Sequence, residues 1–235
     1  MQPQWRPDAV LRFLIGLLLA MMIGGLISSS MVAEGGSQDP DFVSLVLNNT
    51  MFYGVFFGLV HFFLKTHGVR WKDVYGLQLP HRRRAVAWGV GFGILVLLPV
   101  WLLTAMSELA LKTLQLDSSR QITVETLIRT DSIGQRLSFG LMAVVLAPLV
   151  EELLFRGILY PTVKQFGHPR MALWGVSVFF AIFHNNLMTF VPLTLLAVGL
   201  TLLYERTGNL LAPISAHIVF NASNFSLLLV QKLEG

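Results

Sequence analysis

Seven apolar runs follow one another along the chain, most of them long enough for a helix to cross a lipid bilayer. They cover residues 9–33, 42–64, 85–106, 137–160, 171–184, 190–204 and 210–230. A hydrocarbon core ~30 Å thick is spanned by about 20 apolar residues in a helix. The first run begins beside two arginines, Arg6 and Arg12, as a signal peptide would, but its length and the later runs favour a membrane helix. The pattern therefore predicts an all-α fold, a polytopic transmembrane helical bundle with about seven spans.

The composition supports a membrane protein and excludes several kinds of chemistry. Of the 235 residues 54% are hydrophobic and 13% are charged, whereas a soluble domain carries about a quarter charged residues. No cysteine is present, which excludes disulfides, a thiolate nucleophile and a cysteine-ligated metal. The net charge is +4, but its basic residues lie in short loops. They indicate membrane topology rather than a nucleic-acid surface, so no nucleic-acid partner is expected.

The loop charges predict an orientation in the cell membrane. The basic loops hold Lys65, Arg70, Lys72, Arg82, Arg83 and Arg84, then Lys164 and Arg170, and finally Arg206. These loops all lie on one side, which the positive-inside rule assigns to the cytoplasm together with the N-terminus. The acidic loop 34–41 and the long mixed loop after the third span then lie outside. Residues 108–116 of that long loop could form an interfacial helix.

Three of the apolar runs contain polar side chains that are costly inside a bilayer. The fourth holds Glu151, Glu152 and Arg156, the fifth holds His184, four residues after Phe180, and the seventh holds His217 and Asn221. An ionisable group at that depth costs at least ~2.5 kcal/mol, so each needs a partner or a function. At ~1.5 Å per helical residue, Glu151, His184 and His217 lie roughly 18, 20 and 12 Å from the cytoplasmic face. The three side chains are therefore expected at similar depths, between the bilayer midplane and the cytoplasmic side.

The spacing within the motifs suggests a division of roles. Glu152 and Arg156 are four residues apart and share a helix face, which predicts a structural ion pair. Glu151 points ~100° away from Glu152 and is left to face a cavity. A buried carboxylate beside a histidine such as His184 suits a general base. His217 and Asn221, also four apart, share a helix face.

In order along the chain, Glu151-Glu152-x-x-x-Arg156, Phe180-x-x-x-His184 and His217-x-x-x-Asn221 resemble the motif set of the CPBP intramembrane proteases. That family includes the CAAX prenyl endopeptidases and bacterial members linked to bacteriocin processing and peptide immunity, the Abi proteins. The resemblance covers about residues 138–225. It divides the chain into an N-terminal membrane region, 1–136, with three spans and a long outer loop, and a catalytic core, 137–235, with four spans.

The resemblance implies an intramembrane endopeptidase that uses a glutamate-activated water, without metal or other cofactor, in a cavity open to the cytoplasm. Glu151 and His184 would activate the water, and His217 and Asn221 would hold the oxyanion. Glu152 and Arg156 match the remaining motif positions as supporting residues, and Phe180 is expected to provide packing. The implied substrate is a membrane-associated protein or a leader-bearing peptide.

Three alternatives remain open at the level of sequence. Glu151, His184 and His217 could ligate a catalytic zinc ion, although the His-Glu-x-x-His motif is missing. The same fold could serve as a non-catalytic membrane scaffold or a peptide-immunity protein. Intramembrane glutamate and histidine could also form the proton relay of a transporter, but the chain shows no internal two-fold repeat.

Overall fold

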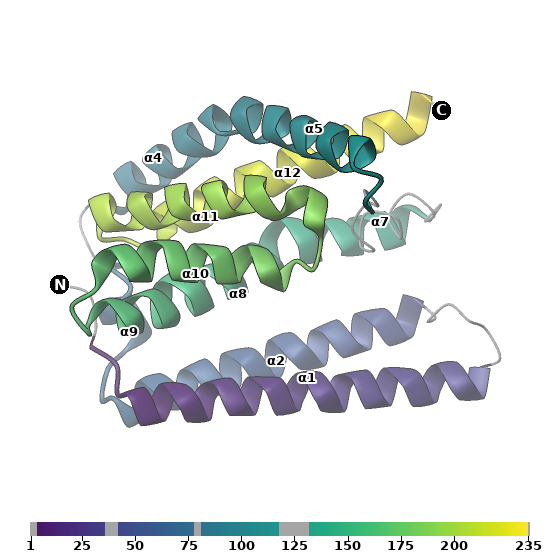
Figure 1. Ribbon diagram of the computed structural model, residues 1–235. Coiled ribbons are helices and arrows are strands. Elements are labelled where there is room, and N and C mark those ends of the chain that lie inside the picture. The colour runs from purple at the N-terminus through teal and green to yellow at the C-terminus, as the bar shows by residue number, and fades with distance from the viewer. Residues whose placement is uncertain (1–3, 36–41, 78–80, 118–131, 235) are drawn as a thin grey trace. The chain divides into compact units, whose positions relative to one another are not determined.

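In the computed structural model, residues 4–35, 42–77, 81–117 and 132–234 are described, and every regular element among them is a helix. The helices are α1 Pro7–Gly35, α2 Phe42–Thr66, α3 Trp71–Val74, α4 Arg82–Leu95, α5 Leu97–Thr113, α7 Ile133–Gly140, η1 Leu141–Leu146, α8 Ala147–Glu152, η2 Leu153–Leu159, α9 Tyr160–Lys164, α10 Pro169–Phe183, α11 Leu187–Thr207 and α12 Leu211–Glu234 (Figure 1). Each of the seven apolar runs falls on one of these helices or on a continuous series of them. The predicted all-α membrane bundle is confirmed.

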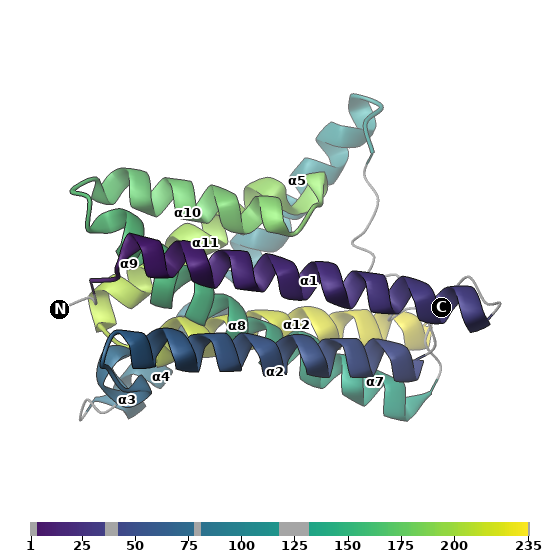
Figure 2. The same ribbon diagram turned by 90° about the horizontal axis from the view of Figure 1, so that it is seen from below.

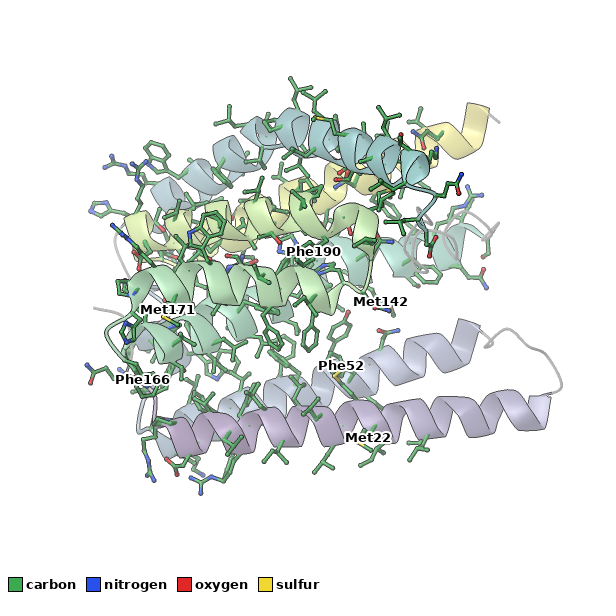
Figure 3. The ribbon with its side chains drawn as sticks, viewed as in Figure 1. Met22, Phe52, Met142, Phe166, Met171 and Phe190 are labelled. Carbon is green, nitrogen blue, oxygen red and sulfur yellow. The ribbon has the colours of Figure 1, made fainter. Side chains whose placement is uncertain are left out.

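Five helical stretches in the described part of the chain are long and apolar enough to cross a membrane. They are Pro7–Ile27, Arg82–Thr113, Ile133–Lys164, Leu187–Thr207 and Leu211–Gln231. Helix α10 is also apolar but has only 15 residues, a rise of about 22 Å. Apolar side chains project from the helices, and Phe166 and Met171 are 61% and 68% exposed (Figure 3). Such a surface suits lipid rather than water, as expected for a multi-pass membrane protein.

The chain forms two compact units, Gln4–Val74 and the part from Tyr75 onward. In the first unit, α1 and α2 form an antiparallel pair (Figures 1 and 2). Phe13 contacts Phe63 edge to face at a centroid distance of 5.6 Å, and Trp5 contacts the same ring at 4.9 Å. The Arg6 backbone amide donates to Nε2 of His67 at 3.1 Å, closing the end of the pair.

In the second unit, α4 and α5 form one bent helical stretch. Its helical hydrogen bonds continue through the junction, where the Val96 amide donates to the Phe92 carbonyl at 3.0 Å. Pro99 follows in the first turn of α5 and has no amide to offer the Leu95 carbonyl, which accounts for the bend. The separate interfacial helix predicted for residues 108–116 is wrong, because α5 continues without a break to Thr113. The remainder of the predicted outer loop, 118–131, lies outside the described residues, as do residues 36–41 of the first loop.

Helix α4 packs closely on α12 through two glycines one turn apart. A Cβ atom at Gly89 would lie 2.3 Å from the carbonyl oxygen of Ala212, and one at Gly93 would lie 2.7 Å from that of Ala216. Only glycine permits such an approach of two backbones, as is common between membrane helices. Gly91 lies between the two on another face of α4. A Cβ atom at Gly91 would meet no atom of a described neighbouring segment within 4 Å.

The fourth apolar run is a single helical series that changes geometry twice. The wide π-helical segments η1 and η2 flank the regular segment α8. Each precedes a proline: Pro148 cannot donate to the Val144 carbonyl in η1, and Pro161 cannot donate to the Gly157 carbonyl in η2. π-Helical turns of this kind occur often at functional sites, and here they enclose the Glu151-Glu152 pair.

The glycines of α4 give a test of this packing. We expect Gly89→Ala to lower the unfolding temperature, because the added methyl group meets the α12 backbone and overpacking costs ~1–3 kcal/mol. Gly91→Ala is the matched control, since the methyl group enters open space and alanine favours a helix by roughly 1 kcal/mol over glycine. Thermal unfolding of the purified protein in detergent micelles would compare the two. A Gly89→Ala protein as stable as Gly91→Ala would contradict the close α4–α12 contact.

Candidate active site

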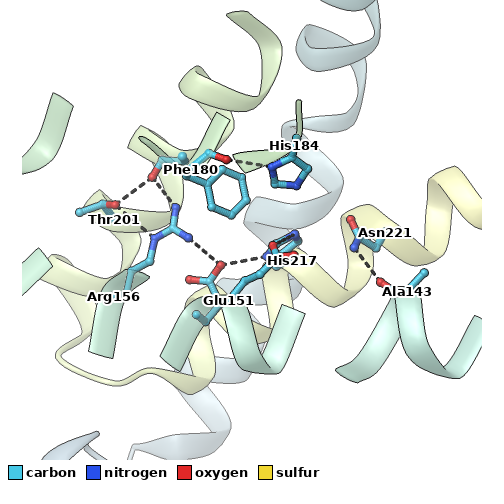
Figure 4. A network of polar contacts seen from close by, with 10 residues as sticks. Ala143, Glu151, Arg156, Phe180, His184, Thr201, His217 and Asn221 are labelled. Atoms are coloured by element: carbon cyan, nitrogen blue, oxygen red, sulfur yellow. Dashed lines mark hydrogen bonds and ion pairs between the residues drawn. The ribbon is translucent and has the colours of Figure 1, made fainter. Parts of the chain in front are cut away.

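All seven predicted site residues lie in the second unit, on or next to four helical segments. Glu151 and Glu152 end α8, Arg156 lies in η2, Phe180 and His184 lie at the end of α10, and His217 and Asn221 lie on α12 (Figure 4). Contacts between these segments bring together residues that are 65 positions apart in the sequence. The site is therefore a product of tertiary packing and not of a single motif.

The ion pair predicted from the i, i+4 spacing is present and fully buried. The Arg156 guanidinium donates to Oε1 of Glu152 at 2.8 Å, and the two side chains are 1% and 0% exposed. Arg156 also donates to the Ala197 carbonyl at 2.9 Å and to the Thr201 hydroxyl at 3.3 Å, both on α11. A buried charge is tolerated when its donors are satisfied in this way.

These partners on α11 are residues that sequence reasoning missed. Ala197 contributes only a backbone atom, which no motif can indicate. Thr201 is a polar residue in an apolar run, four residues after Ala197, and the sequence shows this much. In the structure its hydroxyl donates to the Ala197 carbonyl at 2.9 Å. A single threonine in a membrane helix usually makes this local bond, so the signal was weak.

His217 lies between the two glutamates. Its Nδ1 is 2.9 Å from Oε1 of Glu152, the same oxygen that accepts from Arg156, and its Nε2 is 3.7 Å from Oε2 of Glu151. With Nδ1–H donating to Glu152, the ring orientation is fixed and Nε2 is directed at Glu151.

Glu151 differs from Glu152 in its access to solvent or ligand. Its side chain is 26% exposed, whereas that of Glu152 is 0% exposed. Oε2 is buried and accepts no hydrogen bond from the described residues in either glutamate, so the two differ in the exposure of the rest of the side chain. Of the two carboxylates, Glu151 is therefore the one able to contact water or a substrate.

Phe180 is a packing platform for the site, as the sequence predicted. Its ring is completely buried and lies between Arg156 and His184 (Figure 4). The guanidinium carbon of Arg156 is 5.0 Å from the ring centroid, which is a cation–π distance. The rings of His184 and His217 lie at 4.7 and 5.9 Å. Phe180 thus fixes the separation of the two histidines.

His184 lies at the turn that joins α10 to α11. It is the C-cap residue that follows Phe183, the last residue of α10. Asn185 adopts the left-handed conformation with φ 44°, and the side chain of Asn186 accepts from the Thr189 amide to cap α11. Nδ1 of His184 is 2.8 Å from the Phe180 carbonyl, so Nε2 is the nitrogen left for a ligand. Within the described residues no hydrogen bond or ion pair joins His184 to Glu151. The histidine adjacent to Glu151 is His217.

Asn221 lies one turn beyond His217 on α12 but has a different partner. Its side-chain amide donates to the Ala143 carbonyl in η1 at 2.8 Å (Figure 4). The structure thus joins Glu151, Glu152, Arg156 and His217 in one chain of polar contacts and attaches Asn221 to a separate turn. A second hydrogen atom of the Asn221 amide remains for another acceptor.

The zinc alternative requires three ligands in one place. In the described part of the chain, no three histidine, aspartate or glutamate side chains are arranged so that they could hold a metal ion.

Comparisons with known proteins agree with the C-terminal motifs. Residues 133–223 match the family described as type II CAAX prenyl endopeptidase Rce1-like. An uncharacterized protein of Bacillus subtilis (strain 168), YpbD, is 34% identical over 82 residues, which cover 33% of this chain and 39% of that protein. No solved structure matches. The resemblance to the CAAX prenyl endopeptidases that the three motifs indicated is thus confirmed over residues 133–223, which are similar to the Rce1-like family.

Proposed function

We propose that the protein is an intramembrane endopeptidase in which Glu151 activates the attacking water. The observation that carries this proposal is the partly exposed Glu151 side chain next to His217, whose ring is held by the buried Glu152–Arg156 pair. The Rce1-like family match supports a peptidase at the level of the family. A non-catalytic scaffold would not need an accessible carboxylate beside a fixed imidazole.

The proposed reaction is hydrolysis of a peptide bond. Glu151 takes a proton from water, the water oxygen bonds to the carbonyl carbon, and the carbon–nitrogen bond breaks as the proton passes from Glu151 to the amine. His184, on the neighbouring helix, holds the same water through Nε2. Nε2 of His217, in the form of the ring that carries hydrogen on both nitrogens, and the side-chain amide of Asn221 donate hydrogen bonds to the oxyanion of the tetrahedral intermediate. Glu152, Arg156 and Phe180 position the other residues and do not touch the substrate.

The site lies within helices that are suited to a membrane, and this favours a substrate that is already at the membrane. We propose a membrane-associated protein or a leader-bearing peptide, whose extended segment reaches Glu151 from one side of the bilayer. The reaction needs no metal and no organic cofactor in this proposal, because Glu151 supplies the base and the oxyanion donors are side chains.

Replacing the base tests this assignment. Glu151→Gln keeps the size and hydrogen-bonding ability of the side chain but removes the proton acceptor, so we expect cleavage to fall by about 10²–10⁴-fold. His184→Ala and His217→Ala should also lose activity, whereas Asn221→Ala should retain more than Glu151→Gln. The measurement is a comparison of peptide termini in membranes of cells that produce each variant, since uncut substrate accumulates when activity is lost.

Glu108→Gln is the matched control, since Glu108 forms an exposed pair with Lys112 on α5, away from the site. It should leave cleavage unchanged, and size-exclusion chromatography should show that all variants are folded. Full biological activity of Glu151→Gln would contradict the enzyme proposal and favour the scaffold or peptide-immunity function.

Metal dependence is a separate test. We expect chelators such as EDTA and 1,10-phenanthroline to leave cleavage by the purified protein unchanged, because water activation is assigned to Glu151. Loss of activity with a chelator, restored by added zinc, would overturn the glutamate mechanism.

We further propose that the N-terminus and the basic ends of α2, α4 and α11 face the cytoplasm. The basic residues near these ends support this orientation through the positive-inside rule. Reporter domains fused after Lys65 and after Arg170 should both report the cytoplasmic side. A fusion that reports the opposite side would contradict the seven-span arrangement.

A further inference from the structure

A groove of about 1340 Å³ lies between α4 and α11, away from the Glu151 site. Its walls include the apolar side chains of Trp88, Phe92 and Leu202, and its polar end includes Arg84 and Arg206. Pockets for small organic molecules are typically 300–1,000 Å³. This groove therefore has room for a larger molecule that carries a long apolar chain.

The groove exists because the two helices have different partners. Helix α4 follows α12, held there by Gly89 and Gly93, whereas α11 packs against α5 and α10 (Figure 1). The Phe92 ring lies against Gly199 of α11, where a Cβ atom would be 2.5 Å away. Gly91 also lines the groove, and the space beside its Cα is open.

The polar end of the groove carries a surplus of positive charge. Arg84 and Arg206 are both exposed, and the ion pairs of the described residues involve neither of them. Glu205 lines the groove as well, but its carboxylate is paired with Lys164. Two guanidinium groups thus remain at one end of an otherwise apolar groove.

We propose that this groove binds an anionic phospholipid, with the headgroup phosphate on Arg84 and Arg206 and an acyl chain along Trp88 and Phe92. Guanidinium groups match the geometry of phosphate oxygens. Basic pockets between membrane helices, at the end where positive residues gather, recognise such headgroups. The lipid would stabilise α11, which also carries the Ala197 carbonyl and the Thr201 hydroxyl that hold Arg156. This proposal does not depend on the peptidase function.

The test measures lipid binding by native mass spectrometry of the purified protein, with phosphatidylglycerol and phosphatidylcholine as probes. The wild-type protein should retain one phosphatidylglycerol more tightly than phosphatidylcholine. Arg84→Gln combined with Arg206→Gln should weaken phosphatidylglycerol binding by about 30-fold, the combined effect of two basic residues near an anionic headgroup. Arg84→Lys combined with Arg206→Lys should restore part of this binding, because both positive charges are kept. Gly91→Phe should weaken retention of both lipids by filling the groove without a backbone clash.

Two controls distinguish the groove from general attraction to the membrane. Arg82→Gln combined with Arg83→Gln removes the same charge from residues that do not line the groove. Gly175→Phe adds the same ring to an open position on α10. Both should bind phosphatidylglycerol like the wild type. Equal retention of the two lipids by the wild type, or equal losses in the groove variants and their controls, would overturn the proposal.

Discussion

The second unit of the protein depends on one electrostatic constraint, the burial of the Arg156 guanidinium among helices that exclude water. Moving an ion out of water costs several kcal/mol unless its donors are satisfied. Here the partners are Glu152 on the same helical series, the Ala197 carbonyl and Thr201 hydroxyl on α11, and the Phe180 ring on α10. None of these segments can slide past the others without leaving a charge unpaired.

The burial of Arg156 affects the candidate catalytic residues through a single atom, Oε1 of Glu152. Oε1 of Glu152 accepts from both Arg156 and His217, so the position of the imidazole follows that of the guanidinium. The neighbouring glutamate, Glu151, meets this network through Oε2, which lies 3.7 Å from Nε2 of His217, and its side chain is partly exposed. The two adjacent glutamates therefore have different contacts and different exposure, because the helix turns by about 100° between them.

Most of the fold and part of the site could be predicted from the sequence. Apolar runs indicated the helices, and the four-residue spacing indicated the Glu152–Arg156 pair, because both properties are local. The contact of Glu151 with His217 rather than His184 could not be predicted, since it depends on how α8, α10 and α12 are rotated about their axes. The end of α5 was also missed, because charged residues such as Glu108 suggested a break in a helix that continues through them.

The 15-residue length of α10 has a consequence for the surrounding lipid. Its rise of about 22 Å is less than the ~30 Å of a typical hydrocarbon core, so the polar turn His184-Asn185-Asn186 ends within that thickness. A bilayer adapts to such hydrophobic mismatch by thinning locally. A local thinning of the membrane at this turn would shorten the path by which water molecules reach the interior of the protein, and the proposed hydrolysis would consume one of them at every turnover.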